Sequence, residues 1–252
     1  MADAPGAARY DDWPPEAAAA VERAIAVHGG EARWRPARAI RLEFGALGGA
    51  LPALKGYRRT FPAPRAIEIH PHRRTTIFHG YPDVDSRGRF VDGDVSIERL
   101  ADGAVIASSA HHRRTFDGLA RNRRWRPLDT LYFFGYALWH YHVVPFTLPE
   151  ARFVRLLRHG RGLPGVEVSF AADLPTHSRR QSFFFGADGR IARHDYVAEI
   201  VGAWARGCHF WNDYGTVDGL AIAMSRRVVG RLFGQPTPLG VLRAHFTGAS
   251  VT

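Results

Sequence analysis

The chain has 252 residues, of which 46% are hydrophobic and 23% are charged, a composition typical of a globular protein. Its one cysteine, Cys208, excludes an internal disulfide and a multi-cysteine metal site. The net charge of +10 comes from arginines, in pairs such as Arg226-Arg227 that are scattered along the chain. We interpret these pairs as a solvated basic surface, which argues against a nucleic-acid partner.

The beginning of the chain predicts a short arm followed by a helix. Residues 1–14 are expected to form a flexible arm, and residues 15–252 a single ligand-binding domain. The helix should begin after a Pro-Pro pair at 14–15 and end at a Gly-Gly pair at 29–30, because proline is tolerated in a first turn and glycine favours a helix end. No basic segment followed by an apolar stretch is seen here, so we expect no signal peptide and a cytoplasmic location.

Most of the remaining sequence predicts short strands. In residues 39–46, AIRLEFGA, apolar and charged residues alternate with a period of two, which indicates a half-buried strand. Strands joined by tight turns, such as the turn that contains Gly103, imply an antiparallel sheet rather than βαβ units. The expected strands and hairpins are 39–46, 56–61, 66–70, 75–78, 90–100 with 104–109, 154–158 with 166–172, 179–185 with 190–200, and 223–233 with 241–246.

The segment 128–148 contains LYFFGYALWHYHVVPF, the most apolar run of the chain. It is too short and too interrupted to span a bilayer, so we expect no membrane span. A helix of about fifteen residues that is apolar on nearly every side belongs in the interior of a protein. Asp129 or Thr130 is the expected N-cap, and Pro145 marks the expected end.

Two histidines interrupt this apolar helix. Tyr132, Tyr136 and His140 follow one another at intervals of four residues and share one stripe. His142 lies about 200° around the axis from His140, so at most one of the two histidines lines a given pocket. A buried histidine beside tyrosines is either a general acid or base, or a hydrogen-bonded part of the core.

The hairpin 179–200 gathers hydrogen-bonding side chains. If its turn at 187–189 sets the register, Gln181 lies opposite Asp195 and Phe183 lies opposite Arg193. This face is either the solvated side of the sheet or a binding cluster, and the sequence leaves both interpretations open. The opposite face would carry Phe184, His194 and Tyr196.

Known motifs for nucleotide, hydride or metal chemistry are absent from the sequence, which contains no Walker loop, Rossmann glycine pattern, HExxH or GxSxG. The pairs His70-Pro-His72 and His111-His112 have metal-ligand spacing but no carboxylate at a recognised distance. We therefore expect neither a metal nor a cofactor. Cys208 and His209 make a poor nucleophile pair, because adjacent strand residues point to opposite faces.

Several phrases in the sequence resemble those of the LolA-like superfamily, in a cytoplasmic bacterial branch: AVHGGEARWRPARAIRLEF, FHGYPDVDSRGRFVDGDVSIE, LDTLYFFGYALWHY and THSRRQSFFFGADGRIARHDYVAEIVG. The resemblance implies a mainly β (α+β) fold, in which helices pack in or over the concave face of a strongly curved antiparallel sheet, a half-barrel. It also implies an apolar binding cavity. Periplasmic relatives carry lipoproteins, and a cytoplasmic relative of the VioE type rearranges an aromatic intermediate without a cofactor.

From these features we expect a protein that binds a hydrophobic or aromatic small molecule. The leading hypothesis is a cofactor-independent isomerase, lyase or cyclase that uses acid–base chemistry, and the alternative is a non-catalytic carrier of a lipid or other apolar ligand. The expected catalytic residues are His140, His194, Tyr196 and Asp195. The expected substrate-binding residues are Tyr132, Tyr136, Trp139, Arg113, Arg193 and Phe184, with an arginine anchoring a substrate carboxylate.

Overall fold

Thirteen strands form one sheet in the computed structural model, which describes residue 10 and residues 12–56, 65–158 and 164–252. The sheet order is β6-β5-β4-β3-β2-β1-β13-β12-β11-β10-β9-β8-β7, and all neighbouring strands are antiparallel. The strands are β1 Ile40–Gly48, β2 Ala66–His70, β3 Thr75–His79, β4 Ser86–Val91, β5 Asp94–Arg99, β6 Val105–Ser109, β7 Arg152–Arg158, β8 Pro164–Ser169, β9 Arg180–Phe185, β10 Ile191–Val197, β11 Arg206–Val217, β12 Leu220–Leu232 and β13 Gln235–Val251.

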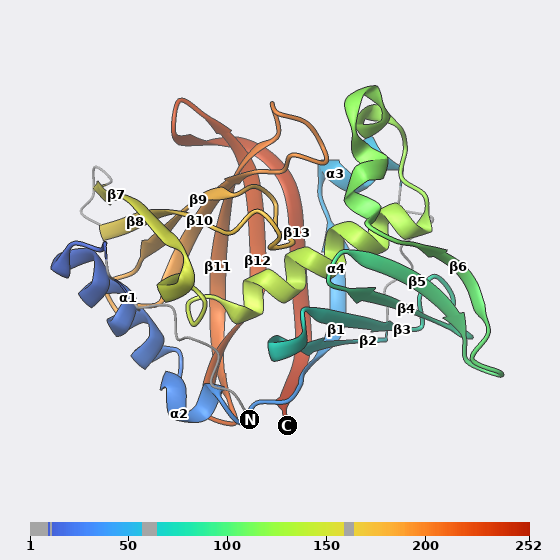
Figure 1. The fold of residues 1–252 in the computed structure, drawn as a ribbon, viewed down its shortest axis with the longest axis horizontal. Helices are drawn as coiled ribbons and strands as arrows, with labels where there is room; N and C mark the ends of the chain where they lie inside the picture. The colour runs from blue at the N-terminus through green and yellow to red at the C-terminus, as the bar shows by residue number, and fades with distance from the viewer. Residues whose placement is uncertain (1–9, 11, 57–64, 159–163) are drawn as a thin grey trace.

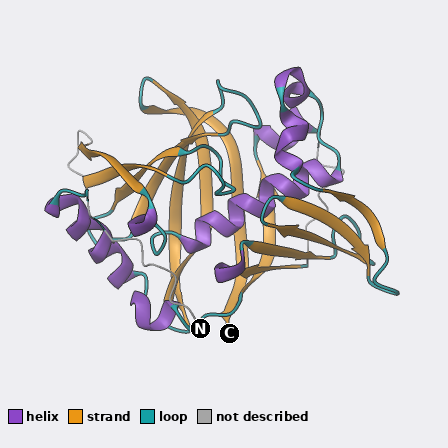
Figure 2. Ribbon diagram, viewed as in Figure 1, coloured by secondary structure: helices purple, strands orange, loops and turns teal. Residues whose placement is uncertain are grey.

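Two helices precede the first strand in the chain, a short helix lies beside the sheet, and a long helix lies inside its curve (Figure 2). Buried Ala17, Val21 and Ala24 of α1 recur at helical spacing, and Gly29 follows the helix with a positive φ of 116°. The expected first helix and its glycine ending are therefore confirmed. The α-helices are α1 Pro15–Val27, α2 Gly30–Trp34, α3 Ala50–Lys55 and α4 Pro127–Val143, and the 3₁₀ turns are η1 Pro71–Arg73, η2 His112–Phe116, η3 Gly118–Asn122 and η4 Leu148–Glu150.

The sheet curves around α4, which lies along its hollow (Figure 1). The first six strands run from the centre of the sheet to one edge, α4 crosses the hollow, and β7–β13 return from the other edge to pair with β1. The edge strands β6 and β7 do not pair with each other, so the sheet stays open. The predicted fold class, a mainly β half-barrel with a helix over the concave face, is confirmed.

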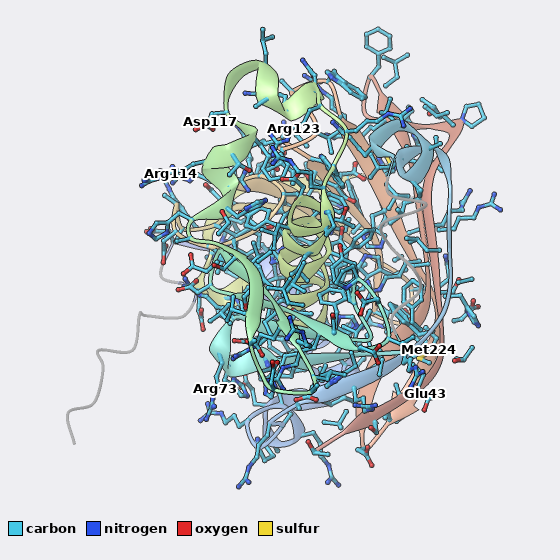
Figure 3. The ribbon with its side chains drawn as sticks, turned by 90° about the vertical axis from the view of Figure 1, so that its right-hand side faces the viewer. Glu43, Arg73, Arg114, Asp117, Arg123 and Met224 are labelled. Atoms are coloured by element: carbon cyan, nitrogen blue, oxygen red, sulfur yellow. The ribbon has the colours of Figure 1, made fainter. Side chains whose placement is uncertain are left out.

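The predicted buried helix 128–148 is α4, and each of its residues from Asp129 to Val143 is buried. Its expected cap was wrong. The N-cap is Arg126, and Asp129 lies three positions later, where its carboxylate accepts a 2.8 Å hydrogen bond from the Arg126 backbone N–H. Arg123, labelled in Figure 3 on the segment that precedes α4, donates to the same carboxylate at 2.7 Å. A side chain inside the first turn thus replaces the expected cap.

Most predicted hairpins are present, with two corrections. The β5–β6 turn has Gly103 at a φ of 72°, as expected, but Phe90 belongs to the preceding strand because Asp92 and Gly93 both take positive φ and form a turn there. The long strand β11 is missing from the expected strands, although Cys208 and His209 were treated as neighbours on a strand. Three other predicted segments lie wholly or mostly outside the described residues. They are the strand 56–61, the turn at 159–163 and the arm 1–14.

The predicted register of the 179–200 hairpin was wrong by one residue. His194 lies opposite Phe183, and Arg193 lies opposite Phe184, because a bulge interrupts the pairing between Ile191 and Arg193. A shift of one residue exchanges the faces of one strand relative to the other. His194 therefore shares its face with Phe183, whose ring is stacked on it at 4.4 Å between centroids.

Candidate functional site

A cavity of about 380 Å³ lies between α4 and the concave face of the sheet. Its walls come from α3, α4, β1, β10–β13 and the 198–205 loop, and most of the side chains that face it are aliphatic or aromatic. On β12 they include Val228, which stands in the same alternation as Arg226, and Arg231 joins the lining beyond an irregularity in the pairing between Val229 and Arg231. No aspartate or glutamate is among the described residues that line the cavity.

Large apolar side chains surround the opening of this cavity. Leu54 of α3, Trp204 of the 198–205 loop, and Leu232 and Leu239 from the ends of β12 and β13 line it, yet each is at least 58% exposed. Figure 1 shows these elements together at one end of the sheet. An exposed apolar rim of this kind marks a place where apolar molecules enter or bind.

The deep end of the cavity is polar, and its hydroxyls belong to a buried hydrogen-bond chain. Tyr141 and Tyr196 line the cavity, and the Tyr141 hydroxyl donates to the Tyr196 oxygen at 3.1 Å. The Tyr141 oxygen therefore accepts from His177 Nε2, 2.5 Å away. His177 Nδ1 is left to accept from the Tyr136 hydroxyl at 2.9 Å. Burial raises the pKa of Tyr141 and Tyr196 far above neutral pH, so both keep their protons.

Arg226 of β12 lies at the same end, only 4% exposed. Its guanidinium stacks over the Trp211 ring at 4.3 Å and lies 5.3 Å from the Tyr141 ring, and one Nη2–H points to His142 Nε2 at 3.5 Å. Among the residues that the structure describes, its Nε and Nη1 have no hydrogen-bond partner. Burial lowers the pKa of Arg226 to about 10, which still leaves the side chain charged at neutral pH.

His209 of β11 is the second unsatisfied group at this end. It is 1% exposed, and neither of its ring nitrogens has a hydrogen-bond partner in the described part of the chain. Its ring lies 4.5 Å from that of Tyr141 between centroids. Burial, and then the charge of Arg226, hold the pKa of His209 well below its usual range, so the ring is neutral and offers one donor and one acceptor.

The two histidines expected to act as acid or base lie deeper in the core and do not line this cavity. His140 and His194 each direct Nε2 to Gln181 Oε1, at 3.1 and 2.5 Å. Both imidazoles must donate to this single carbonyl oxygen, which fixes their tautomers. Burial lowers the pKa of His140 to about 4 and that of His194 well below 6.5.

The remaining candidates occupy three other places. Tyr132 and Arg113 line a separate polar hollow, where Arg113 donates to the Thr176 carbonyl at 2.8 Å and to Glu199 at 2.5 Å. Trp139 donates its indole N–H to the Pro71 carbonyl at 3.1 Å. Arg193, Asp195 and Phe184 lie on the face of the hairpin opposite to His194. There Arg193 forms a salt bridge with Asp195 through two hydrogen bonds and lies 5.0 Å from the Phe184 ring.

Of the predicted residues, only Tyr196 lines the apolar cavity. Tyr141, His209 and Arg226 were missed as a group, since they come from α4, β11 and β12 and no local pattern joins them. One signal for Arg226 was present in the sequence. It stands in the same alternation as the apolar residues Ile222 and Val228, whereas its neighbour Arg227 does not and is exposed.

The other patterns noted in the sequence bear little on this site. Within the described part of the chain, no group of three or more histidine, cysteine, aspartate or glutamate side chains could hold a metal ion. His70 and His79 contact Glu68 at 2.8 and 3.2 Å, and buried His112 contacts Asp129 at 2.9 Å. No helix among the described residues is long and apolar enough to cross a membrane.

Comparisons with known proteins find similarity in structure alone. No protein-family model and no curated protein matches the chain. A LolA superfamily protein from Nitrosomonas europaea is similar over 94% of this chain and 93% of its own, at 8% identity and a TM-score of 0.47. A DUF1329 family protein from Desulfovibrio piger is similar over 93% and 92%, at 12% identity and a TM-score of 0.42.

Proposed function

We propose that the chain binds a hydrophobic small molecule in the cavity between α4 and the sheet. The observation that carries this proposal is the cavity itself, about 380 Å³ of space with mostly apolar walls. Binding sites for small molecules have this size and character, with a few polar groups that orient the ligand. The apolar rim, with Trp204 66% exposed, gives such a molecule an unhindered apolar entrance.

Binding alone is the function that this geometry supports best. His140 and His194 do not line the cavity, and their Nε2 atoms donate to Gln181. A general acid or base has to reach the proton that it transfers, directly or through one water molecule. The geometry therefore supports retention or transport of an apolar ligand better than it supports turnover of that ligand by these two histidines.

One observation favours a second candidate, a cofactor-independent acid–base enzyme. The chain from Tyr136 through His177 and Tyr141 to Tyr196 ends at the cavity wall, where it can supply a proton to a bound molecule. The test is Tyr196→Phe, which removes the last hydroxyl. Loss of turnover of an identified ligand with its affinity retained supports catalysis, and unchanged turnover contradicts it.

The binding proposal is tested with N-phenyl-1-naphthylamine, an uncharged probe whose fluorescence rises in apolar surroundings. Wild-type protein should bind it saturably. Ala244→Trp, on a half-buried position of the cavity wall, fills the space and should weaken binding at least about tenfold, equivalent to about 1.4 kcal/mol. Ala101→Trp, on an exposed turn, is the matched control. No saturable binding, or equal binding by Ala244→Trp, would contradict the proposal.

A further inference from the structure

The deep end of the cavity contains a positive charge that no acid neutralises. Among the described residues, no carboxylate forms an ion pair with Arg226, although other buried or half-buried arginines have one. Arg193, for example, is as deeply buried and is held by Asp195 through two hydrogen bonds of 2.7 and 2.6 Å. An unpaired buried charge is strongly unfavourable, so Arg226 is an exception that calls for a physical reason.

The aromatic rings beside Arg226 account for only part of its environment. The faces of Trp211 and Tyr141 stabilise the cation, but they do not accept hydrogen bonds in the plane of the guanidinium. Nε and Nη1 find no hydrogen-bond partner within residues 12–56, 65–158 and 164–252, and the same holds for both ring nitrogens of His209. Both side chains line the cavity and contact the same Tyr141 ring. They therefore form one cluster of unused donors just behind the cavity end, and a ligand reaches these nitrogens by displacing the side chains that cover them.

The rest of the cavity sets the chemistry of a molecule that would use these donors. Its walls are mostly apolar, and no described lining residue carries a negative charge that would repel an anion. Arg206, which is exposed, also lines it and adds positive charge, whereas the guanidinium of Arg231 lies 3.6 Å from the Asp195 carboxylate on the other face of the sheet. A guanidinium with two free N–H directions and a neighbouring imidazole N–H match the two oxygens of a carboxylate.

We propose that the cavity takes a hydrophobic monocarboxylate, with its carboxylate held by Arg226 and His209 and its apolar body directed along α4 toward Trp204 and the rim. This inference rests on the proposed binding function and deepens it by naming the ligand class. The carboxylate accepts hydrogen bonds from Arg226 and from the His209 N–H. The ligand thereby supplies the missing counter-charge, and the charged end enters first.

The experiment compares two displacing molecules of the same chain length, dodecanoate and methyl dodecanoate, against bound N-phenyl-1-naphthylamine. Dodecanoate should displace the probe from wild-type protein at a concentration at least about tenfold lower than the ester does. Hydrogen bonds to charged groups strengthen binding by about tenfold or more. This comparison needs no variant. Equal potency of the two molecules, with the probe still bound, overturns the monocarboxylate while leaving the binding function intact.

Two variants then locate the preference. Arg226→Met keeps the length of the side chain and removes its charge, so it should lose the preference for dodecanoate over the ester, each measured against the variant's own affinity for the probe. Arg227→Gln removes the same charge from the next residue, which is exposed, and should keep the preference. His209→Phe should reduce the preference in the same direction as Arg226→Met. A preference unchanged in Arg226→Met overturns the assignment, and failure of wild-type protein to bind the probe overturns the proposed function itself.

Discussion

Gln181 is the residue that fixes the positions of two buried histidines. Its amide is fully used: Oε1 accepts from His140 and His194, and Nε2 donates to the Thr176 hydroxyl and the Ser178 carbonyl, both at 2.6 Å. Each of these groups lies in the interior, where a hydrogen-bond donor without an acceptor destabilises the folded state. The two imidazoles therefore act as part of the core, and one side chain satisfies both.

Replacement of Gln181 by leucine should lower the free energy of unfolding by about 2–4 kcal/mol, because two buried imidazole N–H groups lose their acceptor at once. Thr176→Val is the matched control, since it removes one acceptor of the same amide and should cost about 1 kcal/mol. Urea denaturation at pH 7.5 measures both. Equal midpoints for Gln181→Leu and the wild type would show that the histidines find other partners.

At the scale of elements, the contact between α4 and β4 depends on a glycine inside the helix. A Cβ at Gly135 would lie 2.4 Å from Phe90 Cβ, closer than packed carbon atoms can approach. The Gly135 carbonyl also accepts a 2.9 Å hydrogen bond from the Thr76 hydroxyl of β3. The absence of a side chain therefore lets the helix lie directly on this half of the sheet.

Gly135→Ala sets two effects against each other. Alanine favours a helix by about 1 kcal/mol, but the clash with Phe90 forces α4 away from the sheet and costs more, so we expect a net loss of about 1–3 kcal/mol in unfolding free energy. Gly240→Ala is the control, because a Cβ there meets no atom within 4 Å. Thermal denaturation compares the two. Stabilisation by Gly135→Ala would mean that helix propensity outweighs the contact.

At the scale of the whole molecule, burial of histidine makes the fold sensitive to acid. Burial lowers the pKa of six described histidines, to about 4 for His28 and His140 and to about 3 for His142. Each is neutral in the folded state and takes up a proton near pH 6.5 when the chain unfolds. The unfolded state then binds more protons, so stability falls as the pH drops from 6.5 toward 4. The six are His28, His140, His142, His177, His194 and His209.

Chemical denaturation at pH 7.5, 6.5 and 5.5 should show this loss directly. Well below pH 6.5 each such histidine contributes a slope of up to about 1.4 kcal/mol per pH unit. His140→Gln should reduce the total slope by about one such contribution. A wild-type stability independent of pH over this range would contradict the assignment.

Much of the fold could be predicted because its signals are local. The turns at Gly103 and at 187–189 mark hairpins, and the apolar run marks α4, whatever the rest of the chain does. The register of the second hairpin could not be predicted, since a bulge after Ile191 leaves no clear mark in the sequence. β11 was missed because burial on both faces, from Gly207 to His209, hides the period of two.

The candidate site was harder to predict than the fold. Its polar end joins Tyr141, His209 and Arg226, which are 68 and 17 residues apart along the chain and meet only through the order of the strands. The arginine pairs were interpreted as solvated surface, yet a strand sends adjacent residues to opposite faces, and Arg226 went inside while Arg227 stayed out. Charge counted along the sequence therefore hid the buried cation at the deep end of the cavity.

The two edge strands of the sheet, β6 and β7, are unequally protected against pairing with strands of other molecules. An edge strand can pair with any extended segment unless charge or shape prevents it. β7 carries Arg152, Arg155 and Arg158, of which the last two are ion-paired with Glu167 and Glu16, and another strand could pair here only by desolvating these charged side chains. β6 instead presents Val105 and Ile106, which are 60% and 53% exposed. Resistance to edge-to-edge aggregation is thus built into one end of this protein and is weaker at the other.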